Sequence, residues 1–103
     1  QKVYEKSIVS PEYHKKGKLS ISETALSQMV LHCVAEFDSR LKVDRIILIR
    51  QVYGYIIKIV LKVPFGIELP GIIHNMQNYI IKNIEKFTGI LLKEVNIIIG
   101  TIS

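Results

Sequence analysis

Residues 64–89 read P-F-G-I-E-L-P-G-I-I-H-N-M-Q-N-Y-I-I-K-N-I-E-K-F-T-G, and this stretch decides the fold. Pro70 suits the first turn of a helix, where its missing N–H would have no partner, and Gly89 suits a left-handed C-cap. Between them, apolar residues recur at the three-and-four spacing of one helix face: Leu69, Ile72, Ile73, Met76, Ile80, Ile84 and Phe87. The sequence therefore predicts one long amphipathic helix whose apolar face is buried.

A strand and a second helix are expected before this stretch. Lys18 to Ser22 alternates in polarity and predicts a first strand, and Ser22 is well placed to cap the helix that follows. That helix carries an unbroken apolar stripe: Leu26, Met29, Val30, Cys33, Val34 and Phe37. Because Cys33 lies within the stripe, we expect a buried and unreactive thiol. Asn83 lies on the core side of the long helix, so it should have a hydrogen-bond partner if it is buried.

The remaining apolar runs predict three further strands. Residues 43–52 and 55–65 are rich in β-branched residues and are separated by Tyr53-Gly54, which is typical of a hairpin. Leu92 to Ile102 predicts a last strand. The order β-α-β-β-α-β is typical of an α+β two-layer sandwich, with a mostly antiparallel sheet and two helices on one face. The strand order within the sheet stays open.

Two helices on one face leave the other face of the sheet to solvent or to a partner. Strict alternation sends Ile57, Ile59 and Leu61 inward and their neighbours outward. The outward set forms a candidate interaction surface in which apolar and basic residues are mixed: Ile46 (or its neighbour Ile47), Ile56, Lys58, Val60, Lys62 and Ile98, with Asn96 among them. Apolar residues clustered on a free face favour a protein partner, although the N-terminal residues could cover them instead.

Length and composition indicate one domain behind a basic leader. The chain has 103 residues and a net charge of +5. Residues 1–18 hold five lysines and two glutamates, so they supply +3 of this charge. Residues 1–16 predict a flexible or loosely docked leader that could include a short strand around Val3 to Val9, and 17–103 predict the single domain. One cysteine and no long apolar run favour a soluble protein in a reducing cytoplasmic compartment.

No residue pattern in the chain indicates catalysis. His32 and His74 lie on the polar flanks of their helices without ligands at metal spacing, and no glycine-rich phosphate motif is present. We therefore expect no enzyme, no cofactor, no metal and no small-molecule substrate. A nucleic-acid-associated protein is the alternative, because RNA-recognition domains share the β-α-β-β-α-β order. However, the central strands are built of isoleucine and valine, and the only aromatic candidates for base stacking, Tyr53 and Tyr55 at the hairpin, are better explained as turn and core residues.

Residues 17–102 contain several short motifs, each present once and in a definite order: Gly17-x-x-x-Ile21-Ser22, a compact hairpin, Phe65-Gly66 and Leu69-Pro70, Gln77, Glu85-x-x-Thr88-Gly89, and Lys93-Glu94-Val95-Asn96-Ile97. In this order the motifs resemble the alkaline shock protein family, which acts in the envelope stress response of Gram-positive bacteria. The resemblance implies that these positions are structural and that the protein is not an enzyme.

The resemblance also implies a setting and partners. It implies an interaction domain at the inner face of the cell membrane that associates with itself or with a family relative, since some members are recruited there by a related membrane anchor. Two features differ from the family pattern. The connection from Phe37 to Val43 has no glycine, and the chain is basic. The compact domain is similar to the anchor-type member or to a divergent member, and this choice stays open.

Overall fold

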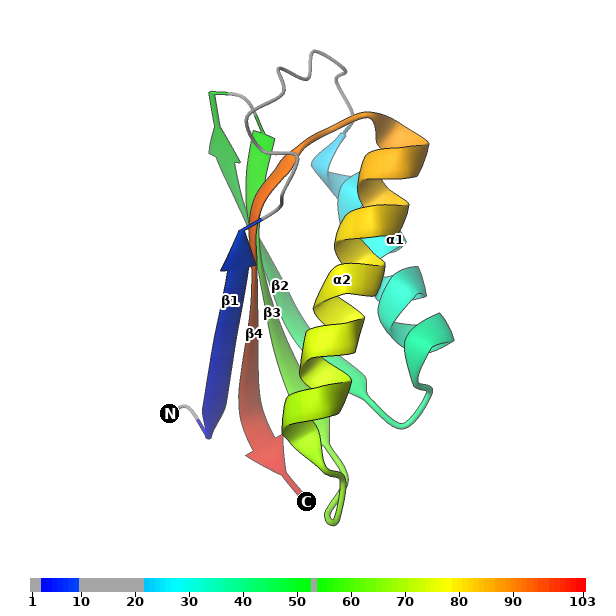
Figure 1. Ribbon diagram of the computed structural model, residues 1–103, viewed down its shortest axis with the longest axis vertical. Coiled ribbons are helices and arrows are strands. Elements are labelled where there is room, and N and C mark those ends of the chain that lie inside the picture. The colour runs from blue at the N-terminus through cyan, green and yellow to red at the C-terminus, as the bar shows by residue number, and fades with distance from the viewer. Residues whose placement is uncertain (1–2, 10–21, 53) are drawn as a thin grey trace.

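The computed structural model describes residues 3–9, 22–52 and 54–103, which form an α+β sandwich of two layers (Figure 1). One layer is a four-stranded sheet, and the other consists of two helices that both cover the same face of the sheet. The elements in chain order are β1 (Tyr4–Val9), α1 (Glu23–Phe37), β2 (Lys42–Gln51), β3 (Gly54–Val63), α2 (Leu69–Thr88) and β4 (Leu92–Ile102). This arrangement confirms the fold class that the sequence predicts.

The strand order in the sheet is β1-β4-β3-β2. The central strands β3 and β4 are parallel and are joined through α2, whereas the outer pairs β1–β4 and β2–β3 are antiparallel. Parallel neighbours need a long crossover, which α2 supplies, and the hairpin places β2 directly beside β3. The chain must therefore pass from one edge of the sheet to the other between β1 and β2.

Strand β1 corrects the domain boundary drawn from the sequence. The short strand expected around Val3 to Val9 is present as Tyr4–Val9, so these residues belong to the sheet and not to a flexible leader. Their register explains why: Tyr4 and Ile8 pair with Ile99 and Val95 and pack against the core. The strand expected at 18–22 lies outside the described residues except for its last residue.

The helix ends follow the expected capping chemistry. Ser22 precedes α1, and its Oγ accepts a hydrogen bond from the Ala25 N–H at 3.1 Å. Pro70 lies in the first turn of α2. Gly89 ends α2 in the left-handed region with φ 72°, and its N–H donates to the Glu85 carbonyl oxygen at 2.9 Å.

The core lies between the helices and the inner face of the sheet. The inward positions of β3 and β4 are almost completely buried: Tyr55, Ile57, Ile59, Leu61, Val63, Val95, Ile97 and Ile99. The helices contribute Leu26, Val30, Cys33, Val34, Ile73, Met76, Ile80, Ile81 and Ile84. Phe87 is a correction, since its side chain is 68% exposed. It was expected on the buried face, but it lies one stripe position beyond Ile84, the last residue of the stripe that the sheet covers.

The hairpin turn lies close to the start of β4. The N–H of Tyr55 donates to the Leu91 carbonyl oxygen at 3.1 Å. A Cβ atom added at Gly54 would overlap that same oxygen, so only glycine fits there without a shift of the backbone. This close approach joins the β2–β3 hairpin to the connection that leads out of α2.

Candidate functional site

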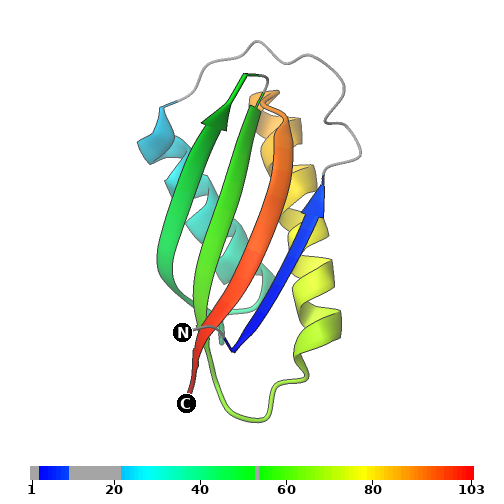
Figure 2. The same cartoon turned by 90° about the vertical axis from the view of Figure 1, so that its left-hand side faces the viewer.

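The face of the sheet opposite the helices, which we name the outer face, is turned toward the viewer in Figure 2. None of the described helices or strands covers it. Side chains alternate between the two faces along β3 and β4, and one set of alternate residues in each strand is in the core. The residues between them therefore belong to the outer face. The apolar members are Ile47, Ile49, Ile56, Val60 and Ile98. The outer face therefore lacks a covering layer within the described residues.

The exposure of these apolar side chains is uneven. Ile47 is 37% exposed, whereas Ile49, Ile56 and Ile98 are half-buried by their neighbours. Val60 is only 7% exposed, and its Cγ1 lies 3.1 Å from where a Cβ at Gly100 would stand. Among these apolar side chains, Ile47 on β2 is therefore the most exposed.

One predicted member of the surface is wrong. Ile46 pairs with the buried Ile59 and packs against the core, while Ile47 pairs with Lys58 and points outward. The cause is a bulge at Asp44, where one extra residue in β2 shifts the register between Val43 and Arg45 and reverses the alternation. The other predicted positions lie on the outer face as expected: Ile56, Lys58, Val60, Lys62 and Ile98.

Charge is unevenly divided over the outer face. The half formed by β2 and β3 carries four cations and one anion: Lys42, Arg45, Lys58, Lys62 and Asp44. The Lys62 Nζ lies 3.9 Å from the Asp44 Oδ1, and both side chains are about half exposed. Exposed pairs of this kind contribute little to stability. This half is therefore basic.

The half formed by β4 and β1 carries the acidic residues. Glu94 Oε2 accepts a hydrogen bond from the Ser7 hydroxyl, and Glu5 Oε2 accepts one from the Asn96 side-chain amide. Both bonds join β1 to β4 across the sheet. Asn96 is itself buried, and its Oδ1 has no hydrogen-bond partner among the described residues. The outer face therefore has a basic half and an acidic half.

Gln77 is a buried polar residue that the resemblance implies is structural, but its hydrogen-bond partners were not predicted from the sequence. It is fully buried in α2, and its Nε2 donates to the carbonyl oxygens of Lys6 at 2.7 Å and Val95 at 3.1 Å. These bonds hold α2 on both β1 and β4. The signal that could have found it was its place on the apolar stripe, three residues before Ile80, where a polar side chain needs a partner.

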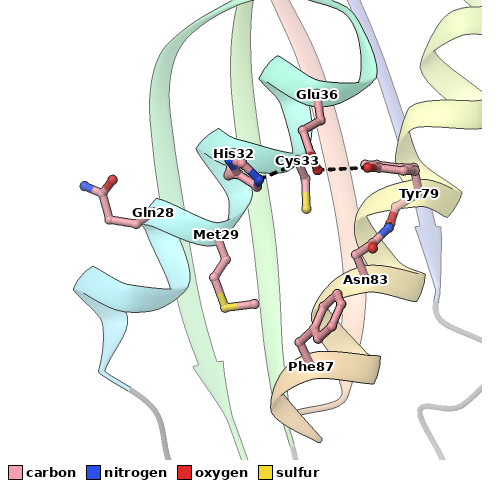
Figure 3. A pocket seen from close by; sticks show the side chains of 8 residues that line it. All are labelled: Gln28, Met29, His32, Cys33, Glu36, Tyr79, Asn83 and Phe87. Carbon is pink, nitrogen blue, oxygen red and sulfur yellow. Dashed lines mark hydrogen bonds and ion pairs between the residues drawn. The ribbon is translucent and has the colours of Figure 1, made fainter.

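A second surface is the groove between α1 and α2 on the side away from the sheet (Figure 3). It encloses about 530 Å³ and is lined by Gln28, Met29, His32, Cys33, Glu36, Tyr79, Asn83 and Phe87. Glu36 joins the two helices by accepting a hydrogen bond from the Tyr79 hydroxyl at 3.0 Å, and it also lies 3.3 Å from the His32 Nε2. Asn83 donates to the Tyr79 carbonyl oxygen at 2.7 Å, which confirms the expected partner.

The chemistry of this groove does not favour a nucleophile. Cys33 is 5% exposed, which confirms the predicted burial. Burial raises the pKa of the Cys33 thiol, and the nearby Glu36 carboxylate raises it further. The thiol is therefore protonated at neutral pH and weakly reactive. The hydrogen bond to Glu36 raises the pKa of Tyr79 as well, so its hydroxyl acts as a donor.

Neither a metal site nor a membrane span is evident in the described part of the chain. No group of three or more His, Cys, Asp and Glu side chains there is arranged to hold a metal ion. Across residues 3–9, 22–52 and 54–103, neither helix is long and apolar enough to cross a bilayer.

Comparison with known proteins adds no relative to this description. No protein-family model, no curated protein and no solved structure matches the chain.

Proposed function

We propose that this domain is a non-catalytic interaction module that associates with a chain of its own kind through the outer face. One observation carries the proposal. The described elements leave a whole sheet face without a covering layer, and that face presents isoleucine and valine side chains among its charges. An uncovered face normally carries polar residues at such positions, and apolar clusters on it more often mark contacts with other chains.

The resemblance to the alkaline shock protein family supports the setting of this proposal. In that setting the module acts at the inner face of the cell membrane during envelope stress, bound to a second copy or to a relative. The geometry of the outer face supports the association itself, while the membrane setting depends on the resemblance alone.

Light scattering of purified protein tests the association. Wild type should form a species heavier than one chain, and the double substitution Val60→Lys, Ile98→Lys should return it to a single chain. Because Val60 is nearly buried, Ile47→Lys with Ile98→Lys is the safer second variant, since Ile47 is already 37% exposed. Circular dichroism must show an intact fold for each variant.

A matched control is available on the other layer. Leu31 has the same 37% exposure as Ile47, but it lies on α1 in the helical layer and not on the outer face. Leu31→Lys should leave the association unchanged. If the outer-face variants associate as wild type does, or if wild type is a single chain at every concentration, the proposed association through this face is wrong.

Nucleic-acid binding is the second candidate, because one observation favours it. The four cations of the outer face gather on β2 and β3, on a sheet face that RNA-recognition domains also use. However, no aromatic side chain from the described residues of β2 and β3 accompanies them, since Tyr55 points into the core. Binding of mixed oligonucleotides that falls steeply between about 50 and 200 mM salt would support this candidate. The absence of such binding would remove it.

A further inference from the structure

The strand registers order the outer face into rows that run across the sheet. One row is Arg45, Val60, Ile98 and Glu5, because Arg45 pairs with Val60, Val60 with Ile98, and Ile98 with Glu5. The next row is Ile47, Lys58, Asn96 and Ser7. Each row therefore begins on the basic half and ends on the acidic half.

This order makes the outer face complementary to itself in one orientation. When two sheets pack face to face with aligned strands, a two-fold axis in the interface lies either along the strands or across them. With an axis that runs along the strands between β3 and β4, each row of one copy faces the same row of the second copy in reversed order. Arg45 then faces Glu5 of the second copy, and Val60 faces Ile98 of the second copy.

The other axis gives the opposite result. A two-fold axis across the strands places β2 over β2 and β3 over β3, so the cations of the two copies lie against one another. Like charges brought together across an interface disfavour that arrangement. The charge division of the outer face therefore selects the axis along the strands.

We infer that two copies of this chain pack outer face to outer face about a two-fold axis parallel to the strands, with Arg45 opposite Glu5 of the second copy. This inference rests on the proposed function and adds its orientation. Four strands of 6, 10, 10 and 11 residues, spaced about 4.8 Å apart, offer roughly 600 Å² per chain, or about 1,200 Å² in total. That is the lower end of the range for specific interfaces, so the dimer should be weak and concentration-dependent.

Charge reversal tests the orientation. Arg45→Glu alone places two glutamates opposite each other at both ends of the row, and Glu5→Arg alone places two arginines there. Each single variant should weaken dimerisation by about tenfold or more in sedimentation equilibrium, since like charges would then meet twice in each dimer. An equimolar mixture of the two variants should form a dimer again, because both contacts then join opposite charges.

Controls keep the test independent of folding. Glu5 accepts a hydrogen bond from Asn96, so Glu5→Gln retains the acceptor while removing the charge, and it should weaken the dimer less than Glu5→Arg. Lys82→Glu makes the same charge reversal on an exposed position of α2 and should have no effect. Thermal unfolding of every variant checks that the fold is intact.

The outcomes separate this inference from the proposed function. Rescue in the mixture supports the inferred orientation. In a second outcome, the double substitution Val60→Lys, Ile98→Lys abolishes the dimer, but mixing the two charge-reversal variants does not restore it. This outcome overturns the orientation and leaves the outer-face association standing. A dimer that persists in all outer-face variants, for example one formed through the β2 edge, overturns both. A protein that stays monomeric to millimolar concentration also overturns both.

Discussion

Replacing Gln77 with glutamate tests how α2 is held on the sheet. The side chain is fully buried, and its amide donates to the carbonyl oxygens of Lys6 and Val95. Ionised glutamate has the same shape but cannot donate. Two lost hydrogen bonds cost roughly 1–3 kcal/mol, and burying the carboxyl raises its pKa by roughly 3 units, which costs about 4 kcal/mol at neutral pH. The sum approaches the total stability of a small domain, so the variant should be largely unfolded at pH 7.5.

The pH dependence has a definite sign. The pKa of the introduced carboxyl is higher in the folded state than its unfolded value of about 4.3. The favourable protonated form is therefore fully present below that value and is lost as the pH rises through the raised folded-state pKa. In its protonated form the introduced carboxyl would also donate one hydrogen bond. Relative to wild type at the same pH, Gln77→Glu should thus be several kcal/mol more stable at pH 5 than at pH 7.5.

Urea unfolding followed by circular dichroism at pH 5 and pH 7.5 measures this difference. Gln28→Glu is the matched control, because Gln28 is exposed on α1 and its change should stay within about 0.5 kcal/mol at both pH values. If Gln77→Glu unfolds at the same urea concentration as wild type at both pH values, Gln77 does not anchor the helix as described.

The other predictions concern backbone space, thiol access and strand facing. Gly54→Ala should destabilise the fold by roughly 1–3 kcal/mol in urea unfolding, because its Cβ would overlap a backbone oxygen. Gly71→Ala, in open space within α2, should be neutral or stabilising by up to about 1 kcal/mol. Equal stabilities of the two variants would contradict this prediction. Cys33 should react with a thiol reagent far more slowly in native protein than in denaturant, and equal rates would disprove its burial. Ile46→Asp should unfold the domain while Ile47→Asp leaves it folded by circular dichroism, and the reverse order would refute the bulge.

Local signals in the sequence predicted the elements that depend on neighbouring residues. Ser22 as an N-cap, and Pro70 and Gly89 at the ends of α2, depend on the capping and backbone preferences of single residues. The inward row of β3 follows from alternation alone. These features are local, so the sequence contains the information needed for them.

What the sequence left open depends on pairing between distant residues. The position of β1 beside β4 comes from contacts between Tyr4 and Ile99, which no local pattern encodes. The extra residue at Asp44 reverses the facing of Ile46 and Ile47, and a bulge has no reliable signature in a single sequence. Gln77 likewise shows its role only once two strand carbonyls lie against it.

The central claim is that the outer face is an association surface. Methyl NMR spectra of isoleucine and valine, recorded from micromolar to millimolar protein, test it most directly because inner and outer methyl groups alternate along the same strands. We expect concentration-dependent shifts at Ile47, Ile56, Val60 and Ile98, with little change at the inward Ile57 and Ile59. Spectra that do not change with concentration, or shifts that gather around the groove between α1 and α2, would contradict it.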